Sequence, residues 1–207
     1  DTVQPDPVNS SRSTPRVRLM AMAVVVCIVL VAFTERPAFT GFASGLAGFL
    51  GFVLVAFAAL GRFWTSLFIA GRKDAALVQV GPYAACRHPL YLLSLIGMIG
   101  LGLTTRSVVL LLALAGIAAL LHVGAMRAED ALLESTHGEA ARRYRDQVPA
   151  LIPDRSHYSV PELLQIQPRV VWKAVLDAGS LLLALALMQA AHGLQHAGVF
   201  APWSRLP

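Results

Sequence analysis

The residues best suited to chemistry lie in two short segments, and the first is Gly81–Tyr91, GPYAACRHPLY. In this segment a turn is followed by an arginine, an imidazole and a phenol at the start of an apolar stretch. A helix beginning at Pro89 would direct backbone N–H groups and the positive end of its dipole at this cluster, which suits a carboxylate or a phosphate. Arg87 and His88 would add side-chain donors. Arginine and tyrosine are also common anchors at a membrane interface, so a purely structural role stays open.

The second segment is acidic and follows another apolar stretch. Glu129 and Asp130 are consecutive, with Arg127 just before them. Two carboxylates at the edge of a bilayer can neutralise a cationic ligand, although an acidic pair on a solvated helix face often has no such role. His122 precedes Glu129 by about two helical turns and so shares roughly the same face, either as a packed, hydrogen-bonded residue or as part of a site.

Five apolar stretches must position these segments. Four of them are close to the ~20 residues that cross ~30 Å of hydrocarbon as a helix. The fifth is shorter and is punctuated by Gly97, Gly100 and Gly102, so it is predicted to be a short span packed closely on a neighbour. The sequence therefore predicts an all-α integral membrane protein with about five transmembrane helices, at Val17–Thr34, Phe39–Leu60, Pro89–Thr105, Ser107–Ala125 and Val170–Ala191.

The composition agrees with lipid as the solvent of this chain. Of its 207 residues 56% are hydrophobic and 14% are charged, whereas a soluble domain carries roughly 25% charged residues. An ordinary soluble enzyme is therefore excluded. The net charge is +5, but no dense basic run exists and there are only two lysines, so we attribute the excess to membrane orientation and not to nucleic acid. Two cysteines, Cys27 and Cys86, define no disulfide framework.

The basic residues indicate the orientation. Most of them precede the first span or lie in the two large loops, and only Arg36, Arg106 and Arg205 fall on the other side. The positive-inside rule then places the N-terminus and both large loops in the cytoplasm. We expect the chain to lie in a bacterial inner membrane.

Several local features predict how the spans continue and pack. The segment Arg127–Tyr144 is expected to extend span four as one rod, and the apolar strip Val148–Pro153 is expected to fold back over a pocket or to lie on the membrane. An i,i+4 ion pair between Lys173 and Asp177 would carry both charges into hydrocarbon. The glycines of span two are expected to pack helices within the monomer, at positions Gly41, Gly45, Gly48 and Gly51.

Together these residues resemble the integral-membrane methyltransferases of the isoprenylcysteine carboxyl methyltransferase and phospholipid methyltransferase superfamily. In that family an apolar strip leads into G-x-Y, R-H-P-x-Y at a helix start, an acidic pair, and a tail F-G-x-x-Y-x-x-Y ending in V-P-x-x-x-P. The match runs from about Arg62 to Pro153. It consists of Leu77-Val78, Gly81-Pro82-Tyr83, Arg87-His88-Pro89-Leu90-Tyr91, Glu129-Asp130, His137–Tyr144, Val148-Pro149 and Pro153.

The resemblance implies that the protein binds S-adenosylmethionine at the cytoplasmic mouth of a helical hairpin and releases S-adenosylhomocysteine, with no metal required. Glu129 and His88 are the implied catalytic residues, and Glu129 would face the cationic end of the cofactor. The other implied cofactor contacts come from the R-H-P-x-Y motif and the residues before it, namely Leu77, Val78, Tyr83, Arg87, Pro89, Leu90 and Tyr91. Substrate contacts are assigned more weakly, to His122, Arg127, Asp130 and Tyr144.

Departures from the family pattern bear on the substrate. The isoprenylcysteine enzymes hold the substrate carboxylate with an arginine four residues before the cofactor glutamate, where this chain has Ala125. Arg127 lies about 200° further round the helix and does not replace it. In the tail, His137 and Ala141 stand where the family has phenylalanine and tyrosine, and only Tyr144 remains.

The leading interpretation is an S-adenosylmethionine-dependent methyltransferase, similar to isoprenylcysteine carboxyl methyltransferase, whose acceptor is a lipid or a prenylated cysteine. The first alternative is N-methylation of a phospholipid or another lipid amine, with Glu129, Asp130 or His122 as the base. The second is a scaffold or sensor that keeps the fold without turnover. A reductase of the sterol type shares a related architecture, but the chain has no G-x-G-x-x-G dinucleotide fingerprint.

These interpretations predict four parts of the chain. Residues 1–16 would be a disordered tail and residues 17–60 two N-terminal transmembrane helices. Residues 61–153 would form the methyltransferase core, a helical hairpin with a cytoplasmic cofactor-binding segment. Residues 154–207 would supply a linker, a C-terminal transmembrane helix and a short tail, a span that the closest family pattern does not include.

Overall fold

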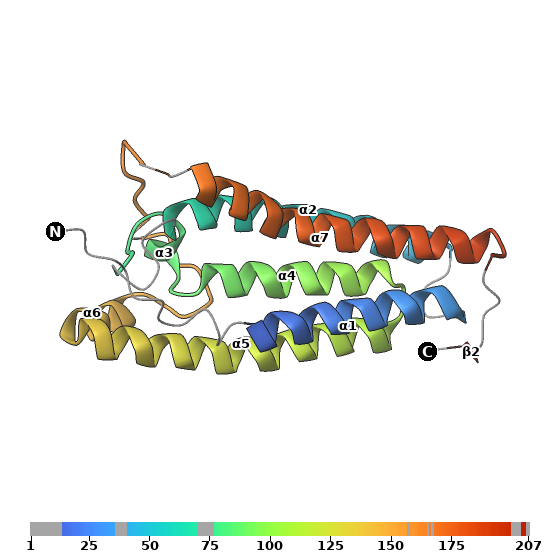
Figure 1. Cartoon of the computed structure of the whole chain (residues 1–207), viewed down its shortest axis with the longest axis horizontal. Coiled ribbons are helices and arrows are strands. Elements are labelled where there is room, and N and C mark those ends of the chain that lie inside the picture. Colours follow the sequence, from blue (N-terminus) through green and yellow to red (C-terminus); the bar gives the residue numbers. More distant parts are fainter. Residues whose placement is uncertain are drawn as a thin grey trace.

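The computed structural model describes residues 14–35, 41–69, 77–156, 158–164, 166, 168–199 and 204–205. Within these ranges the chain is all-α, as predicted, apart from the two-residue strands β1 (Thr34–Glu35) and β2 (Ser204–Arg205), which pair in parallel. Two short helices, α3 (Pro82–Ala85) and α6 (Glu139–Gln147), lie at one end of the molecule, here called the site end (Figure 1). Five long helices run along one axis: α1 (Thr14–Phe33), α2 (Gly41–Ile69), α4 (Pro89–Thr104), α5 (Val108–His137) and α7 (Pro168–His196).

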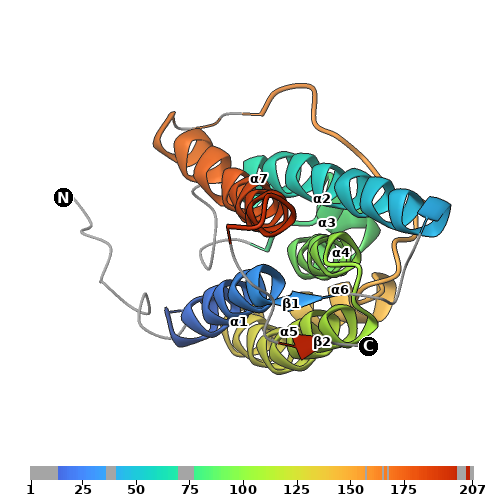
Figure 2. The ribbon, with the colours of Figure 1, turned by 90° about the vertical axis from the view of Figure 1, so that its right-hand side faces the viewer.

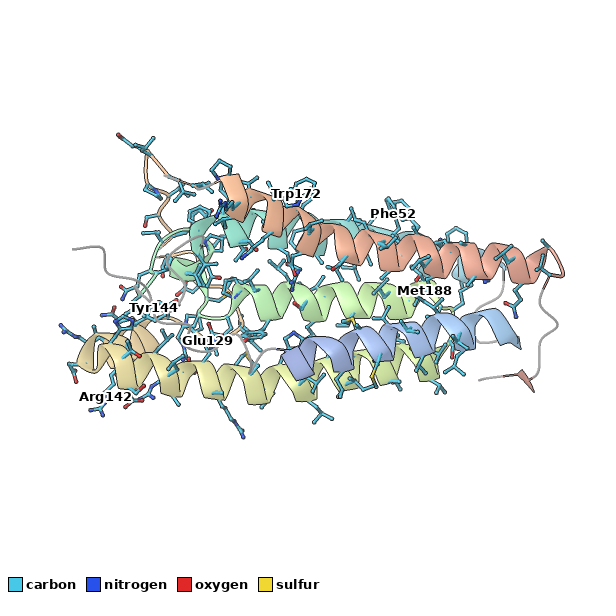
Figure 3. All side chains as sticks on the ribbon, viewed as in Figure 1. Phe52, Glu129, Arg142, Tyr144, Trp172 and Met188 are labelled. Carbon is cyan, nitrogen blue, oxygen red and sulfur yellow. The ribbon has the colours of Figure 1, made fainter. Side chains whose placement is uncertain are left out.

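These five helices correspond to the five predicted spans and identify an integral membrane protein. Helices α2, α5 and α7 are each long and apolar enough to cross a bilayer, and Ala21–Leu30 within α1 and the whole of α4 are shorter apolar helices. Large apolar side chains point outward from the bundle, among them Phe52 and Trp172 (Figure 3). An apolar outer surface of this extent requires lipid around it. Most of the predicted tail, residues 1–13, lies outside the described residues.

Helix α2 is longer than its predicted span. The sequence predicts that the span ends at Leu60 and that Arg62 lies in a loop, but the helix continues through Arg62 to Ile69. The physical reason is that Arg62 finds a carboxylate partner inside the bundle, so its charge does not end the helix. Helix α5 begins where predicted, because the Ser107 side chain caps it by accepting a hydrogen bond from the Leu110 N–H at 3.4 Å.

The predicted single rod from span four to Tyr144 is wrong at Gly138. This glycine has a φ of 53°, a left-handed conformation that glycine adopts without a steric penalty, and it ends α5 after His137. Helix α6 then folds back on α5, where Arg142 and Arg145 contact the Glu134 carboxylate at 2.7 and 2.9 Å. The turn brings Tyr144 to a buried position at the site end.

Helix α4 is central in the bundle and packs against α2, α5 and α7 (Figure 2). Its glycines permit this close packing, as predicted. A Cβ added at Gly100 would lie 2.9 Å from the Gly51 carbonyl oxygen, and one at Gly102 would lie 2.7 Å from the Leu111 Cα. The core beside these contacts consists of apolar side chains from all five long helices, including Val55, Met98, Leu101, Leu114 and Met188.

Of the four glycines at the start of α2, Gly51 packs helices as predicted. For Gly41, Gly45 and Gly48 the prediction is wrong, because an added Cβ at these positions would meet no described atom within 4 Å. Close approach between α2 and α4 therefore depends on one glycine of the series and not on its regular spacing.

Candidate functional site

The segment Gly81–Tyr91 forms two turns that lead into α4. Gly81 has a φ of 61°, and a Cβ there would lie 2.4 Å from the Phe68 ring, so only glycine fits this position. Pro82 opens the short helix α3, and Pro89 opens α4 with His88 as its N-cap. Proline suits a first helical position because its missing N–H has no helical acceptor there.

The strip Val148–Pro153, here called the strap, lies against this segment. The Pro149 and Ala150 carbonyls accept hydrogen bonds from the Arg87 and His88 N–H groups at 2.9 and 3.1 Å. Just beyond the strap, the Asp154 N–H donates to the Ala85 carbonyl at 2.8 Å. Of the two placements expected for this strip, the structure shows the one in which it folds back, and the strip engages the backbone N–H groups of the two residues that precede α4.

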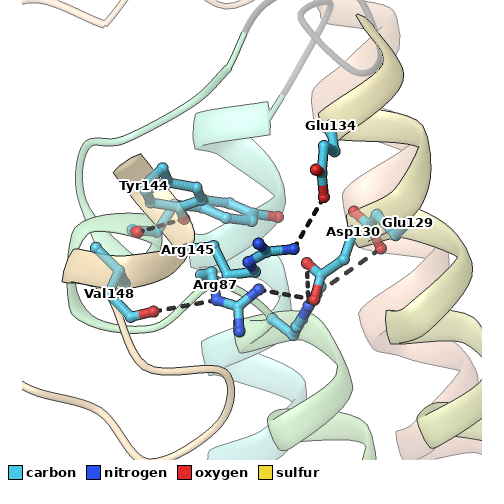
Figure 4. A network of polar contacts seen from close by, with 9 residues as sticks. Arg87, Glu129, Asp130, Glu134, Tyr144, Arg145 and Val148 are labelled. Atoms are coloured by element: carbon cyan, nitrogen blue, oxygen red, sulfur yellow. Dashed lines mark hydrogen bonds and ion pairs between the residues drawn. The ribbon is translucent and has the colours of Figure 1, made fainter. Parts of the chain in front are cut away.

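Arg87 is held between the strap and the acidic pair (Figure 4). Its Nε donates to the Val148 carbonyl at 3.0 Å, and its Nη1 donates to Asp130 Oδ2 at 2.7 Å. The side chain is half-buried, so this ion pair is less screened than one on an open surface. Arg87 thus anchors Asp130 and the strap, and two of its donors are already committed.

His88 lies between the two carboxylates. The residue is 3% exposed, and its Nε2 is 3.0 Å from Asp130 Oδ1. Burial lowers the pKa of His88, and the two carboxylates only partly oppose that shift. A neutral ring that donates from Nε2 to Asp130 carries a lone pair on Nδ1. That Nδ1 is buried without a hydrogen-bond partner among the described residues, 4.0 Å from Glu129 Oε2.

Tyr83 presents a second buried polar atom without a partner. The residue is 6% exposed, and its phenol oxygen makes no hydrogen bond among the described residues. Burial raises the pKa of Tyr83, and the nearby Glu129 carboxylate raises it further. The phenol therefore stays protonated and keeps a donor to offer. Its backbone carbonyl is engaged, since it accepts a hydrogen bond from the Tyr144 hydroxyl at 2.7 Å.

A row of aromatic rings leads from His88 into the bundle. The His88 and Tyr91 ring centroids are 5.7 Å apart, and those of Tyr91 and His122 are 5.1 Å apart in an edge-to-face arrangement. His122 is buried in α5, and its Nδ1 contacts the Ala118 carbonyl oxygen. A carbonyl can only accept, so Nδ1 carries the proton and Nε2 is left with the lone pair.

The structure thus brings Tyr83, His88, Glu129 and Asp130 together, with Tyr91 and His122 behind them. Arg127 is exposed on α5 and makes none of the polar contacts described at the site. A shallow hollow beside the acidic pair is lined by Arg87, Asp130, Leu133, Glu134, Ala141, Tyr144 and Arg145. The roles predicted for these residues, and for half-buried Leu77, Val78 and Leu90 and buried Pro89, stay predictions.

The ion pair predicted between Lys173 and Asp177 is wrong. Asp177 forms an ion pair with Arg62 of α2, at 2.5 Å, and not with Lys173. Lys173 is exposed on α7, where a long flexible side chain can reach toward the membrane interface, while Asp177 meets the guanidinium of the neighbouring helix α2. Helical periodicity relates residues of one helix only, so it could not predict that Arg62 of α2 pairs with Asp177 of α7.

The chain is similar to a known family and to two bacterial proteins. The phospholipid methyltransferase family matches residues 38–140. The cobalt-zinc-cadmium resistance protein CzcN of Cupriavidus metallidurans is 43% identical over 109 residues, 53% of this chain and 50% of its own length. The nickel-cobalt-cadmium resistance protein NccN of Alcaligenes xylosoxydans xylosoxydans is 37% identical over 152 residues, 72% of this chain and 70% of its own.

No solved structure matches the chain. In the described part of the chain, no group of three or more histidine, cysteine or acidic side chains is arranged to hold a metal ion. The family match covers the R-H-P-x-Y turn, α4, α5 and the acidic pair, the same segments that the structure brings together at the site end. The chain belongs to the phospholipid methyltransferase family, within the superfamily that also includes the isoprenylcysteine carboxyl methyltransferases.

Proposed function

We propose that the protein uses S-adenosylmethionine to methylate a lipid or lipidated acceptor that reaches the site from the bilayer. The observation that carries this proposal is a pair of buried polar atoms near the Glu129 carboxylate, Tyr83 Oη and His88 Nδ1, that have no hydrogen-bond partner among the described residues. Buried polar groups are normally hydrogen-bonded, so two such atoms near one carboxylate favour a ligand that completes them.

The hydrogen-bonding groups of the site fit this cofactor. Glu129 and His88 Nδ1 are both acceptors, so together they would receive an ammonium group, and the Tyr83 hydroxyl would donate to an oxygen. Arg87 and Asp130 would hold His88 in the tautomer that exposes its Nδ1 lone pair. When bound, the cofactor supplies an electrophilic methyl group on a sulfonium. The chain's own contribution would be to align the acceptor with that methyl group and to exclude water.

The acceptor's chemistry decides whether a base is needed. A carboxylate, as in prenylated cysteine, is already ionised, whereas an amine must lose a proton. The arginine that would hold a carboxylate is absent, and Ala125 at that position is buried in the bundle. Asp130 is committed to Arg87 and His88, while the Ala118 contact leaves the Nε2 lone pair of His122 for a proton. This supports N-methylation of a lipid amine as a second candidate, with His122 as the base.

The first experiment measures binding and transfer with purified protein in lipid nanodiscs. We expect S-adenosylmethionine to bind in calorimetry, and its labelled methyl group to pass to a component of a total lipid extract or to a farnesylcysteine analogue. Glu129→Gln and His88→Asn should weaken binding about 10- to 100-fold, the value of hydrogen bonds to a charged group. Lys173→Met, which removes an exposed charge on α7, should leave binding unchanged.

The outcomes separate the candidates. Absence of any cofactor binding would remove the methyltransferase proposal, and binding without transfer to any acceptor would favour the scaffold or sensor. Transfer to a phospholipid amine and not to farnesylcysteine would select the second candidate. The relatives are named for resistance to cobalt, zinc, cadmium and nickel, so lipid extracts from cells grown with and without these metals are the acceptors to compare.

A further inference from the structure

Arg62 and Asp177 form a part-buried ion pair between α2 and α7, two helices that are far apart in the sequence. Nη2 of Arg62 donates to Oδ1 and Oδ2 of Asp177 at 2.7 and 2.5 Å, and Nε donates to Oδ2 at 3.1 Å. The Arg62 side chain is 18% exposed and that of Asp177 is 44% exposed. A bidentate ion pair between a guanidinium and a carboxylate fixes the relative orientation of the two groups as well as their distance.

The remaining nitrogen of the same guanidinium holds α4. Nη1 donates to the Leu90 carbonyl at 3.3 Å and also to Ser94 Oγ, and that hydroxyl donates to the same carbonyl at 2.7 Å. The helices are close at this level, because a Cβ added at Gly61 would lie 2.6 Å from Leu93 Cδ2. One side chain of α2 therefore ties the first turn of α4 to α7.

That first turn carries the residues at the centre of the site. His88 is the N-cap of α4 and Pro89 is its first residue, directly before the carbonyl that Arg62 holds. The Asp130 and Glu129 carboxylates that face His88 come from α5, a different helix. A small displacement of α4 along α5 would therefore change the relation of His88 to both carboxylates, and binding sites tolerate displacements of only about 0.5 Å.

The pair also needs both of its charges. A lone arginine or aspartate inside a membrane bundle is costly, and removing one partner leaves the other uncompensated. Asp177 lies outside residues 38–140, the part of the chain that the family matches. The family core thus obtains the counter-charge for Arg62 from an additional helix.

We propose that Arg62 is a positioning residue of the cofactor site and that Asp177 holds it in place, so that α7 takes part in cofactor binding. The proposal rests on the function proposed above. Arg62 acts through the first turn of α4 and does not itself touch the cofactor.

The test compares affinity for S-adenosylhomocysteine with the unfolding midpoint of the full chain in nanodiscs. Arg62→Lys keeps a positive charge for Asp177. A lysine ammonium, however, cannot make the guanidinium's simultaneous hydrogen bonds to Asp177, Leu90 and Ser94. We expect the midpoint to stay near the wild-type value and the affinity to fall by about tenfold or more, equivalent to the loss of about 1.4 kcal/mol. Lys173→Met on the same helix should change neither quantity.

An exchanged pair separates positioning from simple stabilisation. Asp177→Asn alone should lower both the midpoint and the affinity. The double variant Arg62→Asp with Asp177→Arg restores an ion pair between α2 and α7, but the carboxylate now at position 62 has no N–H to donate to the Leu90 carbonyl. We therefore expect the midpoint to recover while the affinity stays weak.

Two results would overturn the proposal. One is wild-type affinity in Arg62→Lys, and the other is recovery of both quantities in the exchanged variant, which would make the pair a structural tie only. If the exchanged variant does not fold, Arg62→Lys decides. A wild-type protein that binds no cofactor is a different result, since it counts against the proposed function itself.

Discussion

At the scale of single residues, two buried tyrosines at the site differ in what their hydroxyl groups do. The Tyr144 hydroxyl donates to the Tyr83 carbonyl at 2.7 Å and so connects α6 to α3. The Tyr83 hydroxyl makes no hydrogen bond among the described residues, although it is equally buried. The first hydroxyl therefore contributes to the stability of the fold, and the second is available to a ligand.

This difference predicts opposite effects of the same substitution. Tyr144→Phe should lower the free energy of unfolding by about 1 kcal/mol, the usual net value of one hydrogen bond. Tyr83→Phe should leave stability unchanged or slightly higher, because a buried hydroxyl without a partner is costly, and should weaken cofactor binding by about 3- to 10-fold. Chemical denaturation and calorimetry of both variants check this. A loss of stability in Tyr83→Phe would mean that its hydroxyl has a partner in the folded protein.

At the scale of the elements, the backbones of α2 and α4 approach each other closely at Gly51. A Cβ at Gly51 would meet the Gly100 carbonyl oxygen at 2.7 Å and the Thr104 backbone nitrogen at 3.0 Å. Because both atoms belong to the backbone, neither can move aside as a flexible side chain would. At Gly48, about one turn earlier, an added Cβ would meet no atom of the described residues within 4 Å.

Two alanine substitutions in the same helix test this contact. Gly51→Ala should force α2 and α4 apart and destabilise the protein by about 1–3 kcal/mol. Gly48→Ala should be neutral or stabilising by up to about 1 kcal/mol, because alanine is the better helix former. Unfolding in mixed detergent micelles measures both. Equal stability of the two variants would contradict the close approach of these helices.

At the scale of the whole molecule, α7 begins at the site end, and its C-terminal end lies at the opposite end of the bundle (Figure 1). We expect the site end to face the cytoplasm, where S-adenosylmethionine is made and where the basic loops belong. The native cysteines are poor targets for thiol reagents, because both are buried and burial raises the pKa of Cys86 to about 11.

Introduced cysteines test this orientation. Glu139 at the start of α6 and Ala197 after α7 are both exposed and lie at opposite ends of the bundle. With a membrane-impermeant maleimide on spheroplasts, Ala197→Cys should react before lysis and Glu139→Cys only after it. The wild-type chain is the control for background from Cys27 and Cys86. The reverse pattern would place the site outside the cytoplasm and would conflict with the proposed cofactor.

Much of this arrangement follows from local properties of the sequence. The length and composition of the apolar stretches are enough to predict five helices in lipid, because each helix satisfies its own backbone hydrogen bonds. The R-H-P-x-Y turn and the acidic pair Glu129-Asp130 were recognisable because residue types at fixed spacing carry the family resemblance. The end of α5 was missed, since Gly138 becomes a break only when α6 can fold back on α5.

Other features were decided by the tertiary structure alone. Helical periodicity predicts Lys173 as the partner of Asp177, but in the folded protein Asp177 forms its ion pair with Arg62 of α2. The spacing of four glycines did not reveal that Gly51 faces another backbone while Gly48 faces open space. Among the described residues the Tyr144 hydroxyl has a hydrogen-bond partner and the Tyr83 hydroxyl has none, and this difference likewise depends on how segments distant in the sequence pack together. Hydropathy and residue spacing are properties of neighbouring residues in the sequence, so they predict helices. Hydrogen-bond and ion-pair partners often come from different helices, so only the packing of the helices decides them.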